Sequence, residues 1–143
     1  MGRLKGFTLL ELMVVLVIMV LVYSLAVPVF STLVPGVELK SATRQLSAGL
    51  RKARSNAVTR KHESTLTLDV EHRQFTVTDD QKKYTLPSEL NLNLKTARRE
   101  QLAPNIGAIR FYPDGSSTGG SITLASGEVR YTIDVNWLTG QVM

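Results

Sequence analysis

The feature that most constrains this chain is one long apolar segment close to its N-terminus. From Phe7 to Val34 the only charged residue is Glu11, and the stretch from Leu12 to Val22 is unbroken apolar sequence. About 20 apolar residues are enough to cross the hydrocarbon core of a bilayer as a helix. Because Arg3 and Lys5 precede the segment, the short N-terminus should stay in the cytoplasm while the rest is exported. The segment therefore predicts an N-terminal membrane anchor.

A cleaved secretory signal peptide is the competing interpretation of the same segment. It would have the same charged start and apolar core, and it could end at the small residues Ser24 and Ala26. Glu11 favours a retained helix, because a carboxylate in an apolar segment costs about 2.5–3.5 kcal/mol at the bilayer centre. A discarded peptide gains nothing from that cost, whereas a retained helix can use the charge if a cation is brought to it.

The residues around Glu11 resemble a known processing motif. Residues 5–11, Lys-Gly-Phe-Thr-Leu-Leu-Glu, closely resemble the type IV prepilin motif. The resemblance implies that a prepilin peptidase cuts between Gly6 and Phe7 and methylates the new amine of Phe7. Gly6 has no side chain to hinder an extended chain in a protease cleft. The resemblance also implies that Glu11, one helical turn from that amine, pairs with the amine of a neighbouring subunit during assembly.

The hydrophobic period beyond the anchor is that of a helix. Apolar residues three and four positions apart predict an amphipathic stem helix whose stripe packs on the molecule's own sheet. The stripe comprises Leu39, Ala42, Leu46, Leu50, Ala53 and Ala57, with Lys40, Arg44, Arg51, Lys52 and Arg54 elsewhere on the helix surface. Pro28 and Pro35 predict a bend or loosening between anchor and stem.

From Ser64 the period changes to two, which predicts about eight short strands, the last one spanning 137–142. The charged residues 96–105 predict a surface loop, and Asp114 is expected to cap a Pro-Asp-Gly turn. The fold class is α+β, with a long N-terminal helix packed on a small antiparallel β head of two sheets. The expected boundaries are a cleaved leader at 1–6, a transmembrane and filament-core helix at 7–34, an amphipathic stem helix at 37–62 and a periplasmic head at 63–143.

Two further segments carry a family resemblance. Residues 111–120, Phe-Tyr-Pro-Asp-Gly-Ser-Ser-Thr-Gly-Gly, and residues 137–142, Trp-Leu-Thr-Gly-Gln-Val, are similar to head signatures of the pseudopilin H and minor pilin T group. The resemblance implies a minor pseudopilin of a type II secretion system at or near the tip of a periplasmic pseudopilus, supporting export of folded proteins. Its implied partners are the other minor pseudopilins, the major pseudopilin, the prepilin peptidase and the inner membrane. A minor type IV pilin for pilus assembly, adhesion or DNA uptake is the alternative.

The charge distribution argues against nucleic acid as a partner. The formal net charge of +5 divides into +6 for residues 1–63, with nine Lys or Arg against three Glu, and −1 for residues 64–143, with eight against nine. A near-neutral head offers few cations to a phosphate backbone.

The sequence also argues against catalysis. His62 and His72 are the only histidines, there is no cysteine, and no nucleophile motif or phosphate loop occurs. Asp114 lacks the companion acids of a calcium loop. We therefore predict no catalytic residue, no metal and no cofactor, and an anchored periplasmic enzyme has no supporting constellation.

Overall fold

The computed structural model describes residues 6–143, except for the side chains of residues 26–35. The chain divides into two compact units, one reaching to Pro35 and the other spanning Gly36–Met143. Helix α1 (Leu9–Arg60) contributes residues to both. The bend predicted at Pro28 and Pro35 falls on residues 26–35, outside the described side chains.

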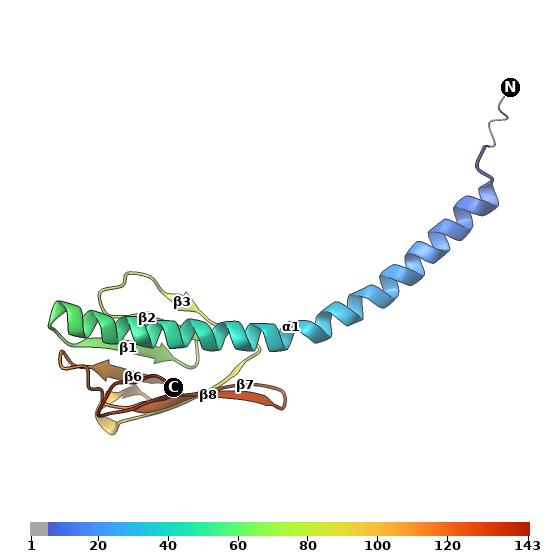
Figure 1. Cartoon of the computed structure of the whole chain (residues 1–143). Helices are drawn as coiled ribbons and strands as arrows, with labels where there is room; N and C mark the ends of the chain where they lie inside the picture. Colours follow the sequence, from blue (N-terminus) through green and yellow to red (C-terminus); the bar gives the residue numbers. More distant parts are fainter. Residues whose placement is uncertain (1–5) are drawn as a thin grey trace. The chain divides into compact units, whose positions relative to one another are not determined.

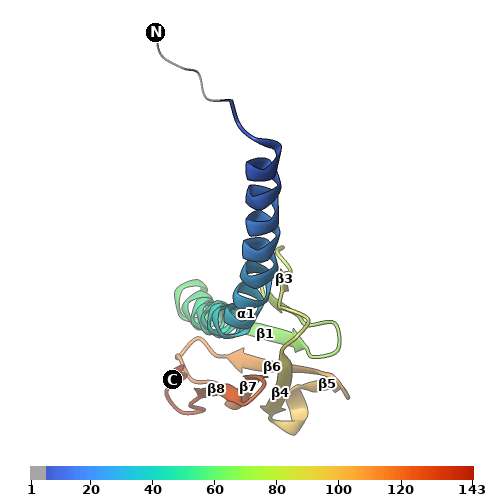
Figure 2. The ribbon, with the colours of Figure 1, turned by 90° about the vertical axis from the view of Figure 1, so that its right-hand side faces the viewer.

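The second unit contains all eight strands of the described chain (Figure 1). The strands are β1 (Ser64–Asp69), β2 (Gln74–Val77), β3 (Tyr84–Thr85), β4 (Asn91–Thr96), β5 (Gln101–Ala103), β6 (Ile106–Phe111), β7 (Gly120–Ser126) and β8 (Val129–Val135). They form a five-stranded sheet in the order β3-β2-β1-β6-β5 and a three-stranded sheet in the order β4-β7-β8. Figure 2 shows β6 between β1 and β5, with β7 and β8 in the other sheet. All strand pairs are antiparallel, so the predicted α+β fold with two antiparallel sheets is confirmed.

One apolar core joins the stem part of α1 to both sheets. The six predicted stripe residues are each at most 1% exposed, which confirms that the stripe packs within the molecule. Their partners in the core include Leu66 and Phe75 of the five-stranded sheet and Ile122, Leu124 and Ile133 of the three-stranded sheet. Fully burying such a side chain contributes roughly 1.5–3 kcal/mol. The helical and the strand periods of the sequence thus meet in a single core.

The segment at 96–105 differs from the predicted loop. It forms a single 3-10 turn, η1 (Arg98–Glu100), followed by strand β5. The cause is tertiary: the carboxylate of Glu100 is buried and accepts a hydrogen bond from Arg110 Nε at 3.0 Å. This contact fixes a stretch whose composition alone is typical of a loop.

The C-terminal segment also differs from the prediction. Residues 137–142 form a turn that returns to a single bridge between Val135 and Val142, instead of a strand. Gly140, with φ at +65°, is the reason, because its backbone N–H donates to Asn136 O at 2.8 Å and closes the turn.

Candidate processing and assembly segments

The predicted cleavage point lies in an open, irregular stretch just ahead of α1. Gly6 and Phe7 are exposed and belong to no helix or strand. A Cβ atom added at Gly6 would meet no atom within 4 Å, so packing within the described chain does not require glycine here. A need for glycine at this position would therefore come from a second protein that must accept the extended backbone.

Glu11 lies in the first turn of α1, where the helix cap fixes its position. The Glu11 N–H donates to Thr8 Oγ1 at 3.2 Å, and the Leu12 N–H donates to Thr8 O at 3.2 Å. Thr8 is thus the N-cap residue, and the Thr-x-x-Glu spacing is that of a capping box. The positive end of the helix dipole favours a carboxylate at this turn. Glu11 therefore lies in the first turn of α1, four residues after Phe7 in the sequence.

The first part of α1 presents apolar side chains on all sides. The large hydrophobic residues between Leu9 and Leu25 are exposed, from 45% for Val15 to 77% for Leu9. A helix that is hydrophobic all round is stable only when lipid or protein covers it. Across the described residues, no helix has the combined length and hydropathy needed to cross a membrane.

The two head signatures meet at one junction on α1. Arg54 donates from Nε to Gly115 O at 3.3 Å and from Nη2 to Thr139 O at 3.1 Å. The backbones approach so closely that a side chain at Gly140 would collide with the carbonyl oxygen of Gly115. The N–H of Ser117 in the first segment also donates to the carbonyl oxygen of Trp137 in the second segment at 2.8 Å. Two separate sequence signatures therefore form one structural element, joined to the helix by a guanidinium.

The Pro-Asp-Gly turn has the predicted cap. Asp114 Oδ1 accepts a hydrogen bond from the Ser116 backbone N–H at 2.9 Å and another from the Ser116 hydroxyl. Both bonds lower the pKa of the Asp114 carboxyl below its usual range, and the bond from the Ser116 hydroxyl contributes most. Within the described residues, no three His, Cys, Asp or Glu side chains gather into a possible metal site.

Arg110 and the two histidines also form ion pairs with carboxylates of the head. Arg110 lies between two carboxylates, the buried Glu100 at 3.0 Å and the half-exposed Glu63 at 2.7 Å. The hydrogen bonds that Arg110 donates to Glu100 and then to Glu63 raise the pKa of its guanidinium further above its ordinary value. His62 and His72 are both exposed and contact single aspartates, as expected for surface residues.

Sequence reasoning missed Arg54 as the residue that joins the head signatures. It placed Arg54 among the basic residues of the stem surface, where the periodic pattern puts it. Its partners are backbone carbonyls 61 and 85 residues further along the chain. Backbone acceptors leave no mark in the identity of the residues that carry them, so no signal in this sequence would have found the contact.

Comparisons with known proteins match both parts of the chain. Residues 1–26 match the prokaryotic N-terminal methylation motif, and residues 42–140 match the family described as type II transport protein GspH. The type II secretion system protein H of Xanthomonas campestris pv. campestris is 32% identical over 140 residues, covering 98% of this chain and 82% of that protein.

Two solved structures have the same fold. The minor pseudopilin EpsH from the type 2 secretion system of Vibrio cholerae aligns with a TM-score of 0.58 at 15% identity, covering 74% of this chain and 94% of that one. The type IV minor pilin FimU of Pseudomonas aeruginosa aligns with a TM-score of 0.59 at 14% identity, covering 74% and 87%.

An N-terminal methylation motif that opens a helix packed on two antiparallel sheets defines a pilin-like protein. Within that class the match over residues 42–140 is decisive, because it covers more than half of the chain and includes the first head signature and most of the second. The chain belongs to the GspH family of type II transport proteins.

Proposed function

We propose that this chain is a minor pseudopilin placed at or near the tip of the periplasmic pseudopilus, where it supports export of folded proteins across the outer membrane. One observation carries the proposal: a single chain joins the methylation motif at 1–26 to a GspH-type head at 42–140. The motif alone would fit any pilin-like subunit, and the head narrows the choice to type II secretion. The contribution of the chain is packing surface toward other minor pseudopilins and the major pseudopilin, not catalysis.

Processing is the first step of the proposed route. A prepilin peptidase would remove residues 1–6 and methylate Phe7. The open backbone at Gly6 and Phe7 supports this step, because the described chain provides no packing that a protease would have to disrupt. The new α-amine has an ordinary pKa of roughly 7.7–8.0 and can carry charge. In the filament, Glu11 would pair with this amine on a neighbouring subunit, which neutralises two charges in an apolar environment.

The remaining layout follows from where apolar surface is exposed and where it is buried. Residues 7–34 would serve as a single-pass inner-membrane anchor and later as filament core, with the N-terminus cytoplasmic. Residues 37–62 would form the stem and 63–143 the periplasmic head. The exposed apolar side chains between Leu9 and Leu25 support a lipid or helix-packed environment for the first part. The core between Leu39 and Val135 supports a head that is stable in water.

A minor type IV pilin is the second candidate, and the fold shared with FimU is the observation in its favour. A deletion strain separates the two. Loss of exoprotein secretion, restored by the gene in trans, is expected for the pseudopilin. Normal secretion together with lost piliation or DNA uptake would favour the pilin instead.

Glu11→Leu tests the assembly role directly. The substitution removes a costly charge from the apolar segment, so membrane insertion should be unchanged or improved. Crosslinking to the other pseudopilins in membranes should fall strongly, because the partner amine loses its counter-charge. Glu38→Leu, which removes a carboxylate from α1 beyond the apolar segment, is the matched control and should crosslink normally. Equal crosslinking of both variants would show that Glu11 is dispensable for assembly.

A further inference from the structure

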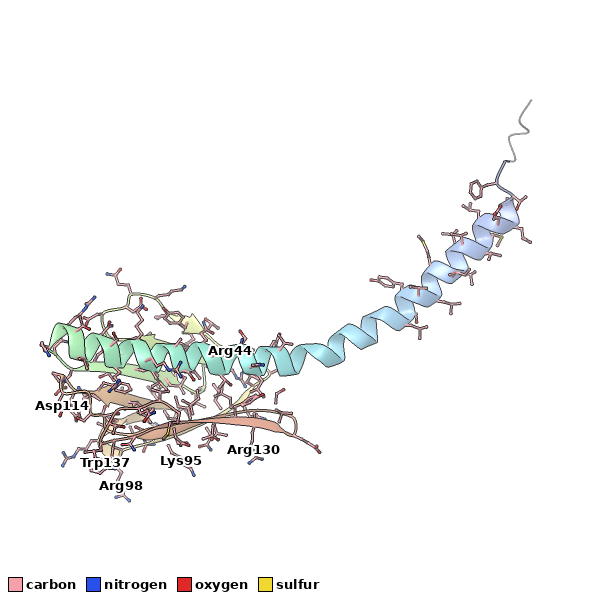
Figure 3. All side chains as sticks on the ribbon, viewed as in Figure 1. Arg44, Lys95, Arg98, Asp114, Arg130 and Trp137 are labelled. Carbon is pink, nitrogen blue, oxygen red and sulfur yellow. The ribbon has the colours of Figure 1, made fainter. Side chains whose placement is uncertain are left out.

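Two large apolar side chains are exposed together on the head. Trp137 is 66% exposed and its neighbour Leu138 is 64% exposed. Scattered surface hydrophobic residues need no explanation, but an adjacent pair that includes tryptophan does. Figure 3 shows Trp137 on the side of the head that is remote from the stem part of α1.

The loop that presents this pair is held by hydrogen bonds. Asn136 Oδ1 accepts from the backbone N–H groups of Leu138 and Thr139 at 2.9 and 3.1 Å. The Gly140 N–H donates to Asn136 O, and the carbonyl of Trp137 accepts the bond from Ser117 described above. The exposure of Trp137 is therefore a fixed property of the fold. A tryptophan presented by a fixed backbone has few rotamers to lose on binding, and tryptophan is enriched among the hot spots of interfaces.

An open groove of about 390 Å³ adjoins Trp137. Its lining includes Ala97, Thr118, Gly119, Gly120 and Lys95. Gly119 has φ at +74°, and a Cβ atom there would lie 3.1 Å from Trp137 Cβ, so the absence of a side chain keeps the groove open. The tryptophan and the two glycines that line this groove could accommodate an apolar side chain from another molecule.

The rim of the groove is basic. Lys95, Arg98 and Arg99 are exposed, and the ion pairs among the described residues involve other cations. Glu100 is the nearest acid in sequence, but its carboxylate is buried against the guanidinium of Arg110 in β6 and forms its ion pair there. Lys95 of β4 lies opposite Ser121 of β7, and Ser121 lies opposite Asp134 of β8. The backbone of Asp134 is therefore two strands, about 10 Å, from that of Lys95. Among the described residues, these three cations therefore form no ion pair.

We infer that the Trp137 face, defined as Trp137, Leu138, the Gly119 groove, Lys95 and Arg98, is a docking site for a segment of another protein. The charge of the rim specifies that segment: an apolar side chain for the groove, flanked by carboxylates for Lys95 and Arg98. Figure 3 shows Lys95 and Arg98 on the same remote side as Trp137.

Trp137 is the only tryptophan of the chain, so its fluorescence reports on the site directly. The experiment titrates the full chain, in detergent micelles, with a short acetylated peptide that carries a central Leu-Phe pair flanked by Asp and Glu. A second peptide has Lys in place of each acidic residue, and an oligothymidylate probes nucleic acid. We expect a saturable blue shift of Trp137 emission with the acidic peptide alone, weaker at higher salt.

Variants locate the binding energy. Lys95→Glu should weaken the acidic peptide at least about tenfold, whereas Lys83→Glu, an equal charge change at an exposed site on the β2–β3 connection, should not. Trp137→Ala, followed by anisotropy of a labelled peptide, should also cost at least about tenfold. The inference would be overturned if the acidic peptide did not bind, or if both peptides bound with equal affinity. It would also be overturned if the two lysine variants weakened binding equally, or if the oligonucleotide bound more tightly than the acidic peptide. None of these results depends on whether the chain is needed for secretion.

Discussion

The junction between the head signatures and α1 gives a quantitative test of the structure. Arg54→Ala removes two charge-assisted hydrogen bonds, those to Gly115 O and Thr139 O. Bonds to charged donors contribute about 1.5–3 kcal/mol each when sheltered, and less at a partly exposed site such as this one. At about 1 kcal/mol per bond, the variant should lose about 2 kcal/mol of unfolding free energy.

The assay is urea denaturation of a fragment that begins at Val37. This fragment keeps the whole buried core and lacks the exposed apolar helix, so we expect it to be soluble and folded. With a slope of about 1–3 kcal/mol per molar urea, the midpoint should fall by roughly 1 M at unchanged slope. Arg51→Ala is the matched control, because this arginine lies about one turn away on the exposed helix surface. Its effect should stay within about 0.5 kcal/mol.

A loss of unfolding free energy in Arg54→Ala no larger than that in Arg51→Ala would show that the two hydrogen bonds do not stabilise the junction. Arg54→Lys adds a second check. A lysine keeps the charge but cannot span two separate carbonyls with the planar fork of a guanidinium, so it should recover only part of the loss. Full recovery would mean that charge, and not the two-point contact, stabilises the junction.

Two further predictions concern ion pairs of the head. A hydrogen bond from Lys52 at 2.7 Å, and then one from Tyr84, hold the pKa of the Asp80 carboxyl at about 2. The stability that this carboxylate contributes is therefore present above its unfolded pKa near 4 and is lost as the pH falls toward 2. In an NMR titration, Lys52→Met should raise the Asp80 pKa toward its ordinary value, and an unchanged pKa would refute this cause. Glu100→Ala should cost about 2–3 kcal/mol of unfolding free energy because it removes a buried partner of Arg110, whereas Glu63→Ala, which removes the half-exposed partner, should cost at most about 1 kcal/mol. Equal losses in urea denaturation would contradict the difference in burial.

Periodicity explains why much of the fold was predictable. The stripe from Leu39 to Ala57 repeats every three or four residues because one face of a helix must be buried, and the alternation from Leu66 reflects one buried face of a strand. The match of residues 1–26 to the N-terminal methylation motif was also predictable, because the resemblance of residues 5–11 is local: a small residue, a cap and a carboxylate within seven positions. Cleavage after Gly6 and the role of Glu11 stay predictions.

Long-range polar contacts explain what was not predictable. Strand β5 exists where Glu100 reaches Arg110, and the turn at 137–142 forms where Gly140 meets Gly115. Neither contact has a period or a fixed spacing in sequence. The exposure of Trp137 has the same origin, because the hydrophobic pattern of the C-terminus predicts a strand that would have buried part of it.

The central claim is that the chain is processed as a pseudopilin and keeps its apolar helix. Intact mass and N-terminal sequencing of the protein from native membranes test it most directly. Loss of Met1–Gly6 with one added methyl group on Phe7 is the expected result, and a strain without prepilin peptidase should yield the uncut chain. Gly6→Leu should also remain uncut, because a branched side chain hinders the extended path through the protease cleft. A mature protein that begins at Val27 would contradict the account, since it would make the apolar segment a secretory signal peptide and leave no anchor for a filament.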